Sequence, residues 1–262
     1  MQQKLTVLIP TYNSHRKFMQ VLKSYEKDNR VKIIVSDDSD DLEEKKLIKS
    51  TCQKFNIRYI NGPRSSPVKN WNLLLKNVDT PFFVLNHHDD YPSNLKFIDQ
   101  LKQEKIGLQI ISCSSKVKGK NMHVIRSWQQ YFFSKICLFF PNACFNIILA
   151  PTASIVVNSK FKNIYFDENL TWFVDADWYL KLFFSLKSYN LKVNFFNKSR
   201  IFSIQDKDSI TSKLKENLKE QIIKEKNYLY SKGLYPGFFV NAIQYAFLAL
   251  ILFISKFKQL LS

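Results

Sequence analysis

Three short apolar runs alternate with longer amphipathic segments, and this alternation constrains the fold more than any other feature of the chain. The runs are Leu5–Ile9, Val31–Ser36 and Pro81–Leu85. Each is short and continuously apolar, which is typical of a strand that is buried on both faces. The segments from about Leu42 to Phe55 and over Val68–Asn77 have the length and spacing of helices. The first hundred residues therefore predict an α/β fold with a mostly parallel central sheet flanked by helices.

The pattern changes after about residue 105. Ala153–Val157 predicts a strand and Val174–Ser188 predicts a helix, whereas the apolar segment Tyr131–Ala150 is interrupted by polar residues and proline. Lys213–Tyr230 predicts a charged amphipathic helix, and Phe238–Ile254 is an apolar run that contains two amides. We expect an α/β domain followed by a helical, partly hydrophobic extension.

The chain is strongly basic, with 39 Lys and Arg against 22 Asp and Glu and a net charge of +17. No acidic residue lies between Glu104 and Asp167, whereas eight basic residues do. Excess positive charge implies an anionic partner, such as a nucleotide, a nucleic acid or an anionic membrane. A codon bias toward Lys explains part of the charge but not the missing acids. We expect no nucleic-acid partner, because the aromatic residues lie within apolar runs rather than between lysines.

Several common enzyme classes are disfavoured by missing motifs. The five glycines are too scattered to form G-x-G-x-x-G or a phosphate-binding loop, which argues against a Rossmann dehydrogenase or a P-loop NTPase. Neither H-E-x-x-H nor G-x-S-x-G occurs. The four cysteines form no C-x-x-C pair, so neither a zinc site nor a disulfide framework is expected.

Acidic pairs follow two of the predicted strands. Asp37 and Asp38 end one strand, and Asp89 and Asp90 follow another. Ligands of open α/β sheets bind at the carboxyl ends of strands, and clustered carboxylates suit Mg²⁺ or Mn²⁺. The alternative is a solvated acidic turn that only caps the following helix, and it applies best to the segment 37–41.

Four short motifs follow one another along the chain. They are Ile9-Pro10-Thr11-Tyr12-Asn13, then Val35-Ser36-Asp37-Asp38-Ser39, then Leu85 to Asp90 with Tyr91-Pro92, and finally the segment from Val174 to Leu182. In this order and spacing they resemble the motifs of inverting family-two glycosyltransferases with the GT-A fold, of the bacterial surface-polysaccharide type. The resemblance covers roughly residues 4 to 210. It implies a GT-A domain at 1–210, with a donor half at 1–105, an acceptor half at 106–210 and an extension at 211–262.

The resemblance implies a donor-nucleotide site at the first two motifs. Tyr12 would lie against the nucleotide base, and Thr11 would line the same pocket. Asp37 would hydrogen-bond the base, with Asp38 beside it. Lys69, which with Asn70 resembles the family's Arg-Asn pair, would lie near the base or the diphosphate.

The third motif implies a divalent metal, Mn²⁺ or Mg²⁺. Asp89 matches the metal-binding carboxylate of the family's D-x-D motif, and Asp90 is the adjacent acid. The first carboxylate of that motif is replaced by His87, which can donate to a ribose hydroxyl or a phosphate but is a poorer ligand for Mg²⁺. The metal dependence is therefore expected to be weaker than in the family.

The fourth motif implies the catalytic base. Asp175 best matches it, but Val174 replaces the glutamate of the family's Glu-Asp pair, which leaves the assignment between Asp175 and Asp177. Two residues apart on a helix, these carboxylates cannot share a face. The implied reaction is inverting transfer of a sugar from a nucleoside diphosphate sugar, by default a UDP-sugar, to a saccharide or lipid-linked saccharide acceptor. The resemblance implies a role in lipopolysaccharide, O-antigen or capsule synthesis.

The end of the chain predicts where the protein works. Residues 235–258 combine the apolar run with flanking lysines, which favours a helix lying on an anionic cytoplasmic membrane surface. Packing within a homodimer and a true membrane span are the alternatives. The chain starts directly with a strand-like run, so we expect no signal peptide and a peripheral location on the inner face of the plasma membrane. Because of the replacements at His87 and Val174, an inactive GT-A scaffold is the main competing function, and a nucleic-acid-binding protein is a remote one.

Overall fold

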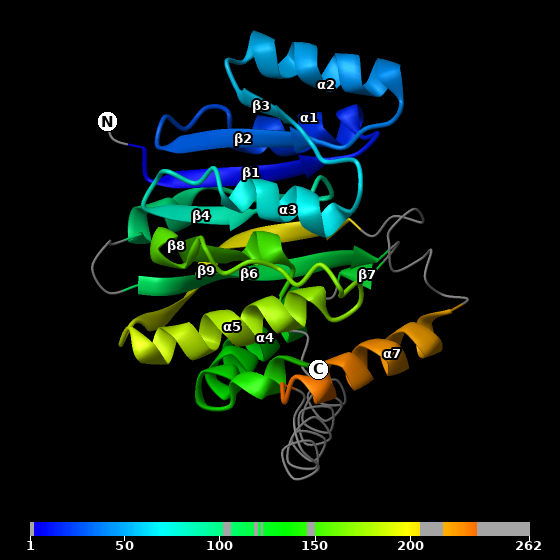
Figure 1. The fold of residues 1–262 in the computed structure, drawn as a ribbon. Helices are drawn as coiled ribbons and strands as arrows, with labels where there is room; N and C mark the ends of the chain where they lie inside the picture. The colour runs from blue at the N-terminus through cyan, green and yellow to red at the C-terminus, as the bar shows by residue number, and fades with distance from the viewer. Residues whose placement is uncertain are drawn as a thin grey trace.

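The computed structural model describes residues 3–101, 106–117, 120–121, 123–145, 150–204 and 217–234. The donor half folds as alternating strands and helices (Figure 1). Its elements are β1 (Leu5–Thr11), α1 (His15–Tyr25), β2 (Val31–Asp37), α2 (Leu42–Lys54), β3 (Arg58–Asn61), α3 (Pro67–Leu75), β4 (Phe82–Leu85), β5 (Asp90–Pro92) and η1 (Lys96–Gln100). The strand order β3-β2-β1-β4 is parallel throughout, as the sequence predicts.

The second half of the sheet is mixed rather than parallel. Strands β8, β6, β9 and β5 extend it beyond β4, and only the β6–β9 pair among them is parallel. The further elements are β6 (Ile106–Val117), β7 (Lys120–Asn121), α4 (His123–Phe139), η2 (Pro141–Phe145), η3 (Thr152–Ser154), β8 (Ile155–Asn158), η4 (Ser159–Phe161), α5 (Val174–Ser188), β9 (Lys192–Ile204) and α7 (Leu218–Ser231). The long strands β6 and β9 escape the sequence analysis because serine, lysine and asparagine interrupt their apolar residues.

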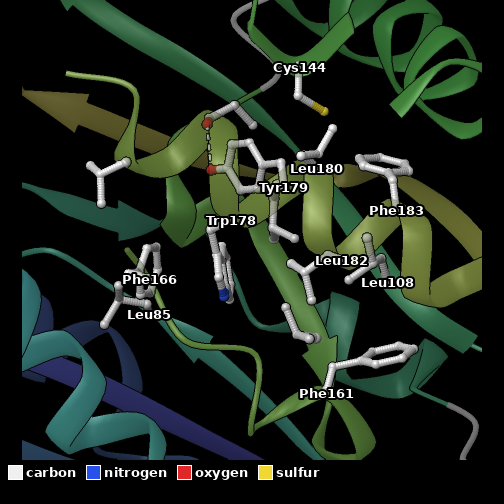
Figure 2. Packing of buried hydrophobic residues seen from close by; sticks show 14 of the residues in the cluster. Leu85, Leu108, Cys144, Phe161, Phe166, Trp178, Tyr179, Leu180, Leu182 and Phe183 are labelled. Atoms are coloured by element: carbon white, nitrogen blue, oxygen red, sulfur yellow. Dashed lines mark hydrogen bonds between the residues drawn. The ribbon is translucent and has the colours of Figure 1, made fainter. Parts of the chain in front are cut away.

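The helices cover both faces of this sheet and bury a hydrophobic core on each. Along β1, Leu8 faces one core whereas Val7 and Ile9 face the other, as the two-residue period of a strand requires. The first core contains residues of α3, α4, α5 and α7, and Figure 2 shows Trp178 and Phe183 of α5 packed among its side chains. The second core contains residues of α1 and α2. Burial of each large apolar side chain contributes about 1.5–3 kcal/mol, so these cores fix the positions of the strand ends.

Helix α5 begins and ends where the sequence predicts, and α7 overlaps the predicted Lys213–Tyr230 helix. Helix α7 packs against the first core through Leu229, whose side chain is fully buried. The predicted membrane-surface segment at 235–258 lies outside the described residues. Among the residues that the structure describes, no helix is both long and apolar enough to cross a membrane.

Candidate active site

The carboxyl ends of three neighbouring parallel strands bring the first two motifs together. Thr11 of β1 is paired in register with Asp37 of β2, and Asp37 is paired in register with Asn61 of β3. The predicted donor residues Thr11, Tyr12, Asp37 and Asp38 therefore meet at one edge of the sheet. A parallel sheet presents its ligand site at this edge.

Asp37 is a fully buried carboxylate whose oxygens are used within the protein. Its Oδ1 accepts hydrogen bonds from Thr11 Oγ1 at 3.0 Å and from the Ser39 hydroxyl at 2.5 Å, and its Oδ2 accepts from the Tyr59 hydroxyl at 3.0 Å. Burial raises the pKa of Tyr59 first, and the charge of Asp37 raises it further. Asp37 thus holds the motif loop in place, while its neighbour carries the more open carboxylate.

Asp38 is held by the backbone of the loop that follows β3. Its Oδ1 accepts a hydrogen bond from the Arg64 amide at 2.8 Å. Gly62 leaves space for this carboxylate, because a Cβ there would lie 2.1 Å from Asp38 Oδ1. Burial raises the pKa of Asp38, and the charge of Asp37 adds to this. The Arg64 amide fixes the Asp38 side chain through Oδ1 only, so Oδ2 is the oxygen that could accept a hydrogen bond from a ligand.

Tyr12 presents its ring to solvent and is 50% exposed. Its hydroxyl donates to Asp40 Oδ2 at 2.8 Å, and Asn13 Nδ2 donates to Asp40 Oδ1 at 2.5 Å. Asn13 has a positive φ of 45°, and its backbone N–H donates to Ser39 Oγ at 2.9 Å. The two motif loops are thereby joined, and the Tyr12 ring is held at an open position where a base could stack on it.

Helix α3 presents the predicted Lys69-Asn70 pair in two environments. Lys69 is exposed in the first turn, where its amide donates to the capping hydroxyl of Ser66 at 3.3 Å. Asn70 is buried and donates to the Ser36 carbonyl at 3.2 Å, with no hydrogen-bond partner for its Oδ1 among the described residues. Asn70 connects α3 to the end of β2, and the Lys69 cation is left in solvent.

The turn after β4 is organised by Asn86, which the sequence analysis did not single out. Asn86 is fully buried; its Nδ2 donates to the carbonyls of His87 at 2.8 Å and Asp90 at 2.7 Å, and its Oδ1 accepts from the Tyr25 hydroxyl at 2.9 Å. An asparagine directly after a buried strand was the only sequence signal for this role. This turn fixes the backbone of the predicted metal-binding motif.

The motif residues themselves differ in exposure. The His87 ring packs edge-on against Trp71 at a centroid distance of 4.9 Å, and burial lowers its pKa to about 4, so it is neutral at neutral pH. Asp89 is partly exposed, whereas Asp90 is 3% exposed and its charge raises the pKa of Tyr25 beyond the effect of burial. No group of three or more His, Cys, Asp or Glu in the described part of the chain is arranged to hold a metal ion. Asp89 is the better placed of the two carboxylates for a metal.

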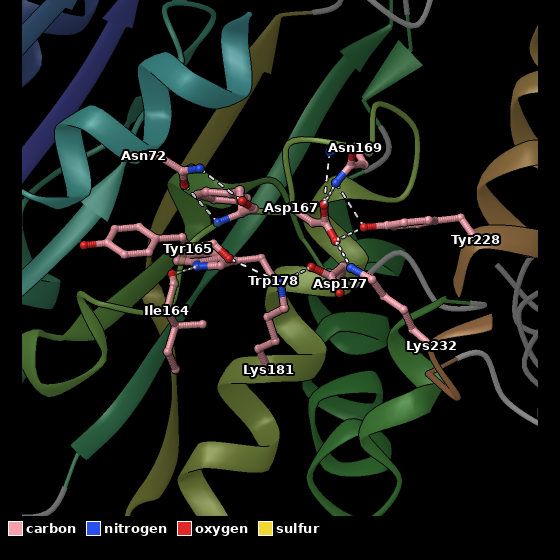
Figure 3. Close-up of polar contacts among 11 residues, drawn as sticks. Asn72, Ile164, Tyr165, Asp167, Asn169, Asp177, Trp178, Lys181, Tyr228 and Lys232 are labelled. Carbon is pink, nitrogen blue, oxygen red and sulfur yellow. Dashed lines mark hydrogen bonds and ion pairs between the residues drawn. The ribbon is translucent and has the colours of Figure 1, made fainter. Parts of the chain in front are cut away.

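The two aspartates at the start of α5 have opposite environments. Asp175 is partly exposed, its Oδ1 is buried without a hydrogen-bond partner among the described residues, and burial raises its pKa to about 6. Asp177 is fully buried and forms an ion pair with Lys181 one turn later, at 2.5 Å. Figure 3 shows Asp177 turned toward the polar contacts around Asp167 and Lys232. A general base needs an accessible carboxylate with a pKa near the working pH. Burial raises the pKa of both aspartates, and of the two only Asp175 is partly exposed.

Residues 6–148, more than half of the chain, match the family described as glycosyl transferase family 2. The chain belongs to this family. The edge of the sheet described above is the candidate active site of this glycosyltransferase. No curated protein matches the sequence.

Solved structures support the same fold. The chain is similar to S. aureus TarS 1–349 in complex with UDP-GlcNAc, with 19% identity and a TM-score of 0.60 over 80% of this chain and 61% of that chain. It is also similar to S. aureus TarS 1–349 in complex with UDP, with 18% identity and a TM-score of 0.57 over 78% and 61%. For S. aureus TarS, the values are 18% identity and a TM-score of 0.55 over 79% and 37%. This glycosyltransferase spans less than two thirds of each of those chains, and the likeness shows the GT-A fold.

Two sets of residues in this glycosyltransferase were missed by the sequence analysis. Ser39 and Asp40 hold the two motif loops; Ser39 ended the second motif without an assigned role, and Asp40 was visible only as a member of the acidic segment 37–41. Glu225 of α7 contacts the loop before α5, and nothing in its sequence neighbourhood distinguishes it from the other charged residues of that helix.

Proposed function

We propose that this family 2 glycosyltransferase transfers a sugar from a UDP-sugar to a hydroxyl group of a saccharide or lipid-linked saccharide, with inversion at the anomeric carbon. The observation that carries the proposal is Asp175, a partly exposed carboxylate whose raised pKa of about 6 suits a general base. The solved neighbours carry UDP-GlcNAc and UDP, which supports a uridine donor.

The chemistry that we propose is a single displacement. Asp175 accepts the proton of the acceptor hydroxyl while that oxygen attacks the anomeric carbon, and the bond from this carbon to the diphosphate breaks. General-base assistance of this kind contributes about 10²–10⁴-fold to the rate. The nucleoside diphosphate leaves with the bonding electron pair, and one displacement inverts the centre without a covalent intermediate.

We propose that the donor lies across the edge of the sheet formed by β1, β2 and β4. The exposed ring of Tyr12 would stack on the base, and the second carboxylate oxygen of Asp38 would accept a hydrogen bond from it. Thr11 and Asp37 would line the buried side of this pocket, because the Thr11 hydroxyl donates a hydrogen bond to the Asp37 carboxylate. Lys69 is left in solvent at α3 and supplies a cation for the diphosphate.

We propose Asp89 as the residue that holds Mn²⁺ or Mg²⁺. One partly exposed carboxylate fits such an ion when diphosphate oxygens and water complete its coordination. The neutral imidazole of His87 would offer a hydrogen-bond donor or acceptor to the phosphates of the sugar nucleotide, and it would add no charge. When bound, the metal would neutralise the charge that develops on the leaving diphosphate. A second metal contact from Asp90 stays a prediction. The side chain of Asp90 is only 3% exposed, which makes it less accessible to a metal than Asp89.

The acceptor and the location of the enzyme are a further part of the proposal. We propose a lipid-linked acceptor at the inner face of the plasma membrane, in lipopolysaccharide, O-antigen or capsule synthesis. Support comes from Phe139 and Phe140, 69% and 57% exposed at the end of α4, and from the exposed Phe184 of α5. Lys187 lies beside them and donates to the Phe139 carbonyl at 3.1 Å. Flotation with vesicles of phosphatidylglycerol, compared with phosphatidylcholine, tests this; no preference for the anionic lipid would contradict it.

A thermal-shift panel tests the donor site. UDP-, GDP- and dTDP-sugars are each added with Mn²⁺, Mg²⁺ or EDTA to the wild type and to Asp89→Ala, with Glu26→Ala as an exposed acidic control. A ligand at about 100 times its Kd stabilises the fold by about 2.7 kcal/mol. We expect a shift specific for the UDP-sugar that is reduced in Asp89→Ala and retained in Glu26→Ala. A lack of shift with every sugar nucleotide would instead favour an inactive scaffold.

A further inference from the structure

The loop that precedes α5 is held by a carboxylate from α7, the last helix of the described part of the chain. Glu225 of α7 is 1% exposed and accepts hydrogen bonds from three consecutive backbone N–H groups. Thr171 N lies 2.8 Å from its Oε1, Phe173 N lies 2.9 Å from its Oε2, and Trp172 N lies 3.1 and 3.0 Å from the two oxygens. Hydrogen bonds to an ionised acceptor are about twice as strong as neutral ones, so this contact fixes the loop backbone.

The start of α5 depends on such a contact because it has no cap of its own. The N-cap residue is Phe173, whose side chain makes no capping hydrogen bond. Asp175 follows Phe173 by two residues, within the first turn of the helix. The position of the Asp175 carboxylate is therefore set by the same backbone segment that Glu225 holds.

Helix α7 is anchored independently at its other end, which keeps Glu225 in place. Asp167 Oδ2 accepts from the Tyr228 hydroxyl at 2.8 Å and from Lys232 Nζ at 2.8 Å, and Asn169 Nδ2 donates to the Tyr228 hydroxyl at 3.0 Å (Figure 3). Burial alone would raise the pKa of Asp167. The hydrogen bonds from Lys232 and Asn169 outweigh burial and hold this pKa well below its ordinary value, so the carboxylate stays ionised. Gln221 Nε2 donates to Glu225 Oε1 at 2.5 Å. Figure 1 shows α7 beside the N-terminal end of α5.

We infer that Glu225 is a positioning residue that fixes Asp175 at the angle and depth needed to take the acceptor proton. This inference rests on the proposed function of Asp175 as the base. It makes α7 part of the catalytic unit, although the family match ends before this helix. A misplacement of about 1 Å can lower a rate by about 100-fold, which gives the scale of the expected effect.

The test compares Glu225→Gln and Glu225→Ala with Glu220→Gln, which changes an exposed glutamate on the same helix. Three quantities are measured for each variant: the rate of UDP release from UDP-GlcNAc, the Kd for UDP, and the pKa of Asp175 by carboxyl ¹³C NMR. The spectrum of Asp175→Asn assigns the resonance. We expect kcat to fall about 10-fold in Glu225→Gln and about 100-fold in Glu225→Ala, with the Kd for UDP unchanged. We also expect the pKa of Asp175 to fall toward its ordinary value in both, because the loop opens to water.

The outcomes separate the two proposals. An unchanged kcat and an unchanged Asp175 pKa in folded Glu225→Gln would overturn the positioning role. A fall in thermal stability with the Asp175 pKa unchanged would also overturn it, because that result describes a purely structural contact. Full activity of Asp175→Asn would overturn the proposed base, and the positioning role with it. If Glu225→Ala does not fold, Glu225→Gln alone decides, since it keeps the side-chain shape.

Discussion

The proposed donor side (Thr11, Tyr12, Asp37 and Asp38) and the proposed base side (Asp175 and the loop before α5) hold their carboxylates in different ways. On the donor side, Asp37 is fixed by Thr11 and Ser39 of the motifs, and Asp38 is fixed by the Arg64 amide in the loop after β3, all within about 30 positions of the chain. On the base side, the loop that leads to Asp175 is held by Glu225, which lies 50 residues beyond Asp175 and in another element. The donor side is therefore encoded locally, and the base side is assembled by tertiary packing.

The energetic consequence also differs between the two sides. Asp37 accepts several hydrogen bonds, so its charge is satisfied in the folded protein. Asp175 has a buried oxygen with no partner among the described residues, and burial raises its pKa. An unsatisfied buried polar group costs about 1–3 kcal/mol, a strain that is expected at a functional site. The comparison predicts that donor-side changes alter ligand affinity, whereas base-side changes alter rate.

The largest expected effect is on the rate of Asp175→Asn. We expect kcat for sugar transfer or UDP-GlcNAc hydrolysis to fall about 10²–10⁴-fold, because the amide cannot accept the acceptor proton. The Kd for UDP, measured by calorimetry, should not change, since the donor site lies on other strands. Rate and affinity together decide whether the two sides are separate.

Asp177→Asn is the matched control for this change. Its carboxylate is fully buried in an ion pair with Lys181, so the substitution should lower the free energy of unfolding by about 1–3 kcal/mol. Its kcat should remain within a few-fold of the wild type at a temperature where both proteins are folded. A loss of rate in Asp177→Asn as large as that in Asp175→Asn would remove the distinction between the two aspartates.

The second prediction concerns stability against pH. The folded-state pKa of Asp175 is raised to about 6 from an ordinary value of 3.8, so the folded protein keeps this proton after the unfolded chain has lost it. Stability from this group is thus present below about pH 4 and is lost as the pH rises through 6. Asp175→Asn should be more stable than the wild type at pH 7 by on the order of 2 kcal/mol, reduced by the partial exposure of the side chain. Urea unfolding at about pH 3.5 and at pH 7 checks this, and an equal difference at both would contradict it.

The two sides also differ in how far the sequence predicts them. The strands β1, β2 and β4 are short and largely apolar and end in motifs, so the sequence predicts these strands and their parallel packing. Their order and the pairing of Thr11 with Asp37 come from the structure. The strands β6 and β9 carry polar residues where they pair with each other, and their pairing is decided by contacts distant in the sequence. Local patterns predict elements, but they do not predict which distant elements pack together.

The same limit applies to the site. Asp175 and Asp177 are the same residue type in the first turn of the same helix, and the sequence analysis left both open as the catalytic base. The ion pair between Asp177 and Lys181 is visible in the sequence only as an i, i+4 spacing, which many surface helices share. The raised pKa of Asp175 comes from burial, a property of the packed loop held by Glu225, which no local pattern records.

A donor-side change of intermediate size is Gly62→Ala. Its Cβ would lie 2.1 Å from Asp38 Oδ1, so the carboxylate must move away from the Arg64 amide. We expect the Kd for UDP to rise about 10-fold, equivalent to about 1.4 kcal/mol, with kcat at saturating donor nearly unchanged. Gly233→Ala is the control, because Gly233 has a positive φ of 68° but no atom of the described residues lies within 4 Å of an added Cβ. It should lower stability without changing the Kd, and an equal change in Kd for both variants would contradict a local effect at Asp38.

The smallest expected effect is that of Tyr12→Phe, which separates the ring of Tyr12 from its hydroxyl. The hydroxyl donates to Asp40 at an exposed position, where one hydrogen bond contributes about 0.5 kcal/mol. The ring remains, so stacking on the base is retained, and the Kd for UDP should rise only about 2–3-fold. Tyr12→Ala removes the ring as well and should weaken UDP by about 1–3 kcal/mol. If the two variants weaken UDP equally, the hydroxyl contact that joins the two motif loops, and not the ring, is what binds the donor; the donor side would then depend on loop assembly in the same way as the base side.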